Sequence, residues 1–162
     1  MLPTDLEAIL KVLHDAGVCF VVVGGIAMRL HGCAHITQDV DVSYARDREN
    51  LKALAQVLAS HHARLRGIPD DLPFILDEFM FRNVQNLTLQ TDLGEVDLLA
   101  VPDGADSFEG LWQRSLQMSL GEFTVHVASI DDLIAMKRAA NRPKDQAHLY
   151  ELLALKKLLE EG

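Results

Sequence analysis

Two aspartates stand one residue apart within a short run of valines. Asp39 and Asp41 alternate with Val40 and Val42 in the segment DVDV. Successive side chains of an extended strand face opposite sides, so both carboxylates share one face while the valines pack on the other. Ionised carboxylates are costly to place in apolar surroundings unless a cation compensates them. The pattern suits a divalent metal site; a solvated strand edge is the alternative, and the spacing alone favours neither.

A third acidic side chain has the same strand parity further along the chain. Asp97 lies in the segment EVDLLA, where Val96 and Leu98 face the opposite way. If this strand neighbours the first, Asp97 projects beside Asp39 and Asp41. Three clustered carboxylates raise one another's pKa unless a cation is bound, and Mg²⁺ accepts such ligands together with substrate phosphates. Two Mg²⁺ ions held by this set suit phosphoryl-type transfer, because they stabilise the attacking and leaving oxygens.

Two glycines directly after three valines form a second candidate feature. Gly24 and Gly25 follow the run VVV and precede a short helical pattern. Glycine lets backbone N–H groups approach a phosphate, and a helix N-terminus favours an anion. In most proteins a lone Gly-Gly pair is an ordinary tight turn between strand and helix, so its combination with the aspartates is what favours a phosphate site. No GxGxxG or GxxxxGK[ST] motif is present to indicate a Rossmann or P-loop site.

The elements that position these residues follow from hydrophobic periodicity and turn signals. The region 64–77 has no clear pattern and is left unassigned. Short strands alternating with amphipathic helices predict an α/β (α+β) fold with a small mixed, twisted sheet flanked by helices. The expected helices are 4–16, 26–31, 48–61, 107–114, 130–141 and 145–160, and the expected strands are 19–23, 39–44, a hairpin of 86–91 with 95–101, and a second hairpin around Gly121.

Composition limits the class of protein. The 162 residues, 49% hydrophobic and 24% charged, suit one domain over residues 1–162. No apolar run approaches the roughly 18 residues of a membrane helix, and the acidic N-terminus does not resemble a signal peptide, so we expect a cytoplasmic protein. The only cysteines, Cys19 and Cys33, do not form a CxxC motif. A net charge of -9 disfavours an RNA partner without excluding one.

The order and spacing of these motifs resemble a known superfamily. Gly24-Gly25, thirteen intervening residues, the segment Asp39-Val40-Asp41-Val42 and the later Asp97 resemble the nucleotidyltransferase superfamily that includes DNA polymerase beta. The wider run G-x-A-x-x-x-x-G-x-x-x-x-T-x-D-V-D and the distal SIDDLIAMKRAANRPKD are similar to small bacterial nucleotidyltransferases related to abortive-infection toxins and minimal nucleotidyltransferases. Together these segments span most of the chain.

The resemblance implies roles for these residues. Asp39 and Asp41 would hold both Mg²⁺ ions, Asp97 would complete the second site and help to activate an acceptor hydroxyl, and Gly24 with Gly25 would hold the triphosphate. The implied activity is transfer of a nucleoside monophosphate from an NTP to a hydroxyl of a small molecule, a protein side chain or an RNA end, with release of pyrophosphate. The alternative is a non-catalytic nucleotide-binding or regulatory protein of the same fold, such as one component of a toxin-antitoxin pair with a partner protein.

One position departs from the pattern of the resembled proteins. They often carry arginine two residues before the threonine of R-x-T-x-D, where this sequence has His35 before Thr37. The resemblance assigns both residues to nucleotide binding. A neutral imidazole binds phosphate less strongly than a guanidinium, although it can donate one hydrogen bond or become charged at lower pH. His35 therefore favours the non-catalytic alternative, whereas the intact aspartates favour the enzyme.

Basic residues gather near the end of the penultimate helix. Ser129 is its expected N-cap, which places Lys137 in the last turn and Arg142 in the following connection. Cations at a helix C-terminus suit the helix dipole, and Asp145 can cap the final helix. The resemblance instead assigns Lys137 and Arg142 to the triphosphate or the leaving pyrophosphate, and the sequence does not decide between the two interpretations.

Two other chemistries are less well supported. His31, Cys33 and His35 lie together in HGCAH and offer imidazole and thiolate ligands to a transition metal. Gly32 interrupts the helical spacing that would bring those ligands onto one face. No G-x-S-x-G motif marks a nucleophilic serine. Mg²⁺-dependent nucleotidyl transfer therefore remains the leading hypothesis.

Overall fold

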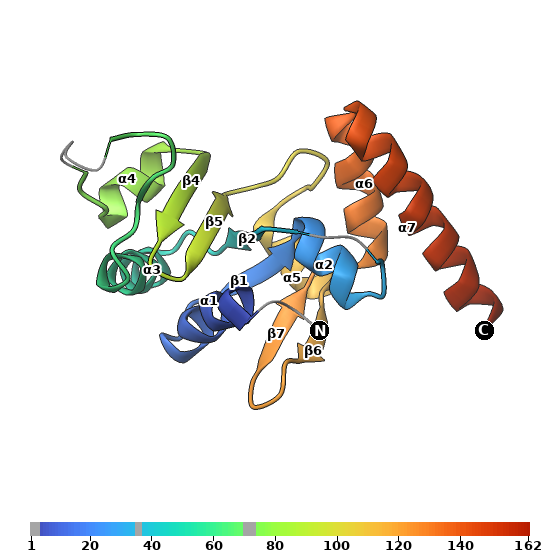
Figure 1. The fold of residues 1–162 in the computed structure, drawn as a ribbon, viewed down its shortest axis with the longest axis horizontal. Coiled ribbons are helices and arrows are strands. Elements are labelled where there is room, and N and C mark those ends of the chain that lie inside the picture. Colours follow the sequence, from blue (N-terminus) through green and yellow to red (C-terminus); the bar gives the residue numbers. More distant parts are fainter. Residues whose placement is uncertain (1–3, 35–36, 70–73) are drawn as a thin grey trace.

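The computed structural model describes residues 4–34, 37–69 and 74–162 (Figure 1). Most of the helices and strands expected from the sequence form within a residue or two of their expected bounds. In chain order the elements are α1 (Thr4–Asp15), β1 (Phe20–Val23), α2 (Gly24–Leu30), β2 (Asp39–Tyr44), α3 (Arg48–Ser60), β3 (Arg64–Leu65), α4 (Glu78–Asn83), β4 (Asn86–Thr91), β5 (Gly94–Leu99), α5 (Phe108–Arg114), β6 (Leu116–Ser119), β7 (Thr124–Val127), α6 (Ile130–Ala140) and α7 (Pro143–Glu161).

The strands form one mixed, seven-stranded sheet in the order β3-β4-β5-β2-β1-β7-β6. β2 lies between β1, to which it is antiparallel, and β5, to which it is parallel. β4 and β5 form the hairpin expected from their alternating sequences, and so do β6 and β7. The predicted α/β fold with a mixed sheet flanked by helices is therefore confirmed.

The apolar residues that alternate with the aspartates in β2 and β5 belong to the hydrophobic core. Val40 and Val42 of β2 and Val96 and Leu98 of β5 are completely buried. The helix α1 packs against both strands. The apolar face of α1, made of Leu6, Ile9, Leu10 and Leu13, is also buried. Because side chains alternate along a strand, burial of these residues directs the intervening acidic side chains to the other face of the sheet.

Two helices at the C-terminal end pack side by side (Figure 1). The hydroxyl of Ser129 caps α6 by accepting a hydrogen bond from the Asp132 N–H at 3.1 Å. α6 ends at Ala140, and its C-cap Asn141 has a left-handed φ of 51°. The final helix begins at Pro143, two residues before the expected start, because proline suits a first helical position. α2 contacts α6, and the start of α2 lines one cavity together with Arg142 of the connection between α6 and α7.

The largest difference from expectation lies in the unassigned region 64–77. Arg64–Leu65 forms the short strand β3, which pairs with β4 at the sheet edge. A strand of two residues is too short to show a period of two in its sequence, so no pattern predicts it. The short helix α4 follows, capped by the Asp77 side chain, which accepts from the Met80 N–H. Among the described residues, no helix has the length and apolar content needed to cross a membrane.

Candidate active site

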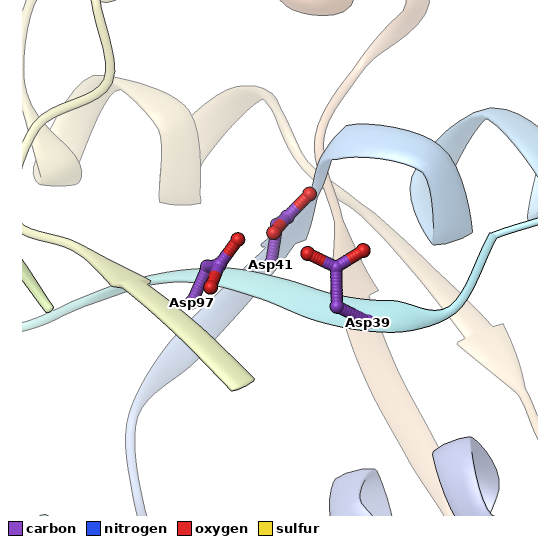
Figure 2. Close-up of side chains that lie close together, drawn as sticks. All are labelled: Asp39, Asp41 and Asp97. Carbon is purple, nitrogen blue, oxygen red and sulfur yellow. The ribbon is translucent and has the colours of Figure 1, made fainter. Parts of the chain in front are cut away.

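Three carboxylates meet on the face of the sheet that the apolar residues leave free. β2 and β5 run parallel with Asp41 opposite Asp97. Oxygen atoms of Asp39, Asp41 and Asp97 all lie within 4.8 Å of one another. Figure 2 shows the three carboxyl groups projecting on the same side of the two strands. The pairing of β2 with β5 meets the condition under which the parity of the two strands predicts this convergence.

Burial and mutual repulsion disfavour the ionised form of this cluster. Burial raises the pKa of Asp41 to about 8, with further contributions from the negative charges of Asp39 and Asp97. The pKa of Asp39 rises to about 6, first through burial and then through its interactions with Asp97. Both values refer to the protein without metal ions, where the cluster holds protons that a divalent cation would displace.

The backbone at Gly24 passes so close to the Asp41 carboxylate that only glycine fits there. Gly24 has a φ of +68°, which L side chains rarely adopt. A Cβ atom added here would lie 2.0 Å from Oδ2 of Asp41. Only glycine lets the start of α2 pass this close to the carboxylate. The Gly-Gly turn and the DVDV strand are therefore parts of one site.

A cavity of about 340 Å³ opens beside the carboxylates. We call it the anion cavity, because most of its lining residues outside the cluster are basic, hydroxyl-bearing or glycine. The Thr37 hydroxyl in its wall donates to the Asp39 carbonyl at 3.2 Å. The lining residues are Gly24, Gly25, Thr37, Gln38, Asp39, Asp41, Asp97, Lys137, Arg142, Lys144 and His148. Eight of the nine residues proposed from sequence lie here; the ninth, His35, is outside the described residues.

The two cations expected to bind phosphate share one buried partner. Nζ of Lys137 donates to Oδ1 of Asp145 at 3.3 Å, and Nε of Arg142 donates to Oδ2 at 2.7 Å. Asp145 is fully buried, and these hydrogen bonds hold its pKa well below the ordinary value. Asp145 also accepts from the Arg142 backbone N–H, so it caps α7 from the third helical position. The cations therefore lie at the helix ends, as the capping interpretation expects, and they also line the cavity; their binding of phosphate stays a prediction.

A second cavity, also of about 340 Å³, adjoins the first. It shares Gly24, Asp41, Lys137 and Arg142 with the anion cavity and does not include Asp97. We call it the mixed cavity, since apolar side chains of β5, its following loop and α6 form much of its wall and two amides lie at the start of β4. Its other lining residues are Val23, Gln85, Asn86, Leu99, Val101, Pro102, Asp103, Leu133, Met136, Ala140 and Asp145.

The other metal-binding hypothesis gains no support from the described residues. Nε2 of His31 is hydrogen-bonded to the Ala128 carbonyl at 2.7 Å. Cys33 is buried, and burial raises the pKa of its thiol. Within the described ranges, Asp39, Asp41 and Asp97 form the one group of three or more His, Cys, Asp or Glu residues whose ligand atoms converge.

The structure also places Arg66, which the sequence did not single out, against the carboxylate cluster. Arg66, which directly follows β3, places a terminal nitrogen 2.9 Å from Oδ1 of Asp97. Its Nε lies 3.7 Å from Glu95, the neighbour of the cluster on β5. Arg66 belongs to the region whose sequence gave no assignable pattern, so only the pairing of β3 with β4 reveals its position.

Comparison with solved structures shows that the chain has the nucleotidyltransferase fold. The backbone is similar to that of the lincosamide antibiotic adenylyltransferase LnuA in its lincomycin-bound form, with a TM-score of 0.63, 13% identity, and coverage of 96% of this chain and 98% of that one. It is also similar to ANT(2'')-Ia in complex with adenylyl-2''-tobramycin, with a TM-score of 0.60, 15% identity, and coverage of 97% and 90%.

A third similar structure is a proposed nucleotidyltransferase of Thermotoga maritima, with a TM-score of 0.54, 13% identity, and coverage of 100% of this chain and 97% of that one. No family model matches the sequence, and no curated protein matches it. At identities this low, the structural similarity shows the fold alone. The chemistry of this chain depends on the residues of its own site.

Proposed function

We propose that the protein is a Mg²⁺-dependent nucleotidyltransferase that moves a nucleoside monophosphate from an NTP to an acceptor hydroxyl. The observation that carries this proposal is the convergence of Asp39, Asp41 and Asp97 within 4.8 Å. The same carboxylates line a cavity that also holds the Gly24-Gly25 turn and two cationic side chains. A polyphosphate and divalent cations are the ligands that suit this combination of groups.

The donor set fits divalent cations. It consists of carboxylate oxygens, which Mg²⁺ prefers. Oδ1 of Asp97 is buried and accepts no hydrogen bond from any described residue. Burial and the mutual repulsion of the carboxylates raise the pKa values of Asp39 and Asp41, and a bound divalent cation would compensate this unfavourable negative charge. Two Mg²⁺ ions held by these residues would neutralise charge on the reacting phosphate and on the attacking and leaving oxygens.

We assign the triphosphate to the anion cavity. Backbone N–H groups at the start of a helix have no partner within the helix, so those of Gly24 and Gly25 suit phosphate oxygens. Lys137 and Arg142 line the same cavity, where their charges favour the departing pyrophosphate. Asp145 holds both cations in place, which reduces the reorganisation needed when the phosphates bind.

We assign the nucleoside to the mixed cavity. The two cavities share the residues next to the carboxylates, so one nucleotide can span both with its α-phosphate at the junction. Apolar side chains such as Leu99 and Met136 suit the faces of a base, and the amides of Gln85 and Asn86 suit its polar edge. Asp97 lines the anion cavity and not this one, so we place the acceptor hydroxyl at the Asp97 end of the anion cavity, next to the α-phosphate.

In the proposed reaction the acceptor oxygen forms a bond to the α-phosphorus, and the bond from that phosphorus to the bridging oxygen of pyrophosphate breaks. Asp97 helps to activate the hydroxyl by accepting its proton as the new bond forms. Positioning and charge compensation supply the catalysis, without a covalent enzyme intermediate. We favour a small hydroxyl-bearing acceptor, because LnuA and ANT(2'')-Ia are described with antibiotics and a net charge of -9 opposes RNA.

The proposal is tested by a transfer assay on the purified protein. Each NTP, labelled at the α-phosphate, is incubated with Mg²⁺ and with lincosamide or aminoglycoside antibiotics, a protein extract, or RNA. Pyrophosphate release together with label on one acceptor class supports the proposal, and Asp41→Asn is expected to abolish both signals. NTP binding without pyrophosphate release on any acceptor would instead support a non-catalytic nucleotide-binding protein, such as a toxin-antitoxin component.

A further inference from the structure

Arg66 brings a positive charge into direct contact with the carboxylate cluster. One terminal nitrogen lies 2.9 Å from Oδ1 of Asp97, and the side chains of both residues are largely buried, at 29% and 20% exposure. The same guanidinium lies 3.7 Å from Glu95 through its Nε. Within the described residues, no other lysine or arginine forms an ion pair with Asp39, Asp41 or Asp97. Arg66 is therefore the cation that directly contacts the cluster within the described part of the chain.

Backbone contacts hold Arg66 independently of Asp97. Its terminal nitrogen donates to the Leu89 carbonyl at 3.0 Å, and its backbone N–H donates to the Thr88 carbonyl at 3.0 Å. Both carbonyls belong to β4, the neighbour of β5. The guanidinium thus keeps its place beside β5 whichever way the Asp97 carboxylate turns.

The contact with Asp97 is electrostatic and does not have the geometry of an orienting clamp. Nε of Arg66 and Oδ1 of Asp97 are both buried, and neither forms a hydrogen bond with a described residue. An arginine that orients a carboxylate usually does so through two parallel hydrogen bonds. Arg66 instead uses the nitrogen nearest Asp97 to donate to a main-chain carbonyl. Its effect on the cluster should therefore come from its charge.

We propose that Arg66 is a built-in counter-ion that competes with a divalent cation for Asp97. The inference rests on the proposed function, because it concerns the metal centre of the same site. A fixed guanidinium repels a cation that approaches the shared carboxylate, so the cluster alone binds its second cation weakly. The triphosphate adds negative charge beside the cluster and offsets this repulsion. Arg66 thereby links full metal loading to the presence of nucleotide.

The test measures Mn²⁺ binding by calorimetry and by electron paramagnetic resonance, with no nucleotide and no acceptor present. We expect Arg66→Gln to bind Mn²⁺ about tenfold more tightly than the wild type, because it removes the repelling charge. Arg66→Lys retains the charge and is expected to bind as the wild type does. Arg64→Gln is the matched control, since it removes the same charge two residues earlier, opposite Gln90.

A thermal melt of each variant shows whether it is folded, and Arg66→Met provides a second neutral variant of similar length. Unchanged or weaker Mn²⁺ binding by both neutral variants overturns the proposal. An equal gain in Mn²⁺ affinity in Arg64→Gln also overturns the proposal, because the gain would then follow from the net charge of the protein and not from the position of Arg66. Absence of Mn²⁺ binding in the wild type and in every variant, also after addition of a non-hydrolysable NTP, refutes the metal centre itself, and the proposed function fails with it.

Discussion

At the scale of single residues, the site depends on how closely the Gly-Gly turn approaches the second aspartate. Gly24 fits because it has no Cβ, and its φ is positive. This explains why a glycine follows three buried valines at a position where another β-branched residue would continue the strand. Glycine is needed here because a Cβ atom would clash with Asp41. The same close approach brings the N–H groups at the start of α2 next to the carboxylates.

Gly24→Ala is therefore expected to lower the free energy of unfolding more than a glycine substitution that meets open space. Gly121→Ala is the matched control, since Gly121 has a φ of +79° with no atom within 4 Å of the added Cβ. The control should lose about 1 kcal/mol through backbone strain alone. Gly24→Ala should lose more, because Asp41 must also move. Urea unfolding measures both; equal losses would show that the close approach at Gly24 carries no constraint.

At the scale of elements, Asp145 joins α6 to α7 and fixes the cations of the anion cavity. The carboxylate is fully buried, and it accepts hydrogen bonds from Lys137 of α6 and from Arg142, which precedes α7. A buried ion pair broken on one side leaves an uncompensated charge. The packing of these helices and the position of the cations are thus maintained by the same group.

Asp145→Asn is expected to destabilise the protein by about 2 kcal/mol, a value below the usual range for buried pairs because Arg142 is partly exposed. Asp131→Asn serves as the control, since Asp131 pairs with Lys156 at 2.7 Å on the surface with 72% of its side chain exposed. Exposed pairs contribute little, so this variant should remain within about 0.5 kcal/mol of the wild type. Similar chemical denaturation curves for the two variants would contradict the anchoring role of Asp145.

At the scale of the whole molecule, local patterns of sequence predicted much of the site. Alternation in DVDV and EVDLLA predicted which side chains share a face, because strand parity is a property of consecutive residues. The pairing of distant strands has no local signal, so the sequence predicts the position of Asp97 only on the condition that β2 and β5 are neighbours. The structure satisfies that condition.

The residues that the sequence did not reveal depend on long-range contacts. Arg66 follows a two-residue strand without periodicity, and its neighbour Asp97 is set by the order of β3, β4 and β5. Asp145 was expected to cap a helix, but its contact with Lys137 arises from the packing of α6 on α7. The effect of His35 in place of arginine stays a prediction, because this residue lies outside the described ranges.

The raised pKa values of Asp39 and Asp41 predict that the stabilisation of the whole protein by a metal ion depends on pH. The pKa values of Asp39 and Asp41 are raised to about 6 and about 8, so the folded state binds more protons than the unfolded state. In the metal-free protein, proton binding by Asp39 and Asp41 therefore contributes to the stability of the folded state. This contribution is fully present below the unfolded pKa of about 4 and is lost as pH rises through 6 to 8. Mg²⁺ should replace these protons.

We therefore expect Mg²⁺ to raise Tm more at about pH 8.5 than at about pH 5.5, where protons compete for the carboxylates. Scanning calorimetry with and without Mg²⁺ at the two pH values measures the difference. Asp41→Asn should reduce the gain in Tm at the higher pH. A gain that is the same at both pH values would show that the cation binds away from these titrating groups.

The central claim is that Asp39, Asp41 and Asp97 together hold divalent cations beside a bound nucleotide. The most direct measurement is anomalous diffraction from crystals soaked with Mn²⁺ and a non-hydrolysable NTP. The account predicts anomalous density between the three carboxylates, with the triphosphate beside Gly25 and Lys137. Density for Mn²⁺ elsewhere, or nucleotide bound with no metal at the cluster, would contradict it.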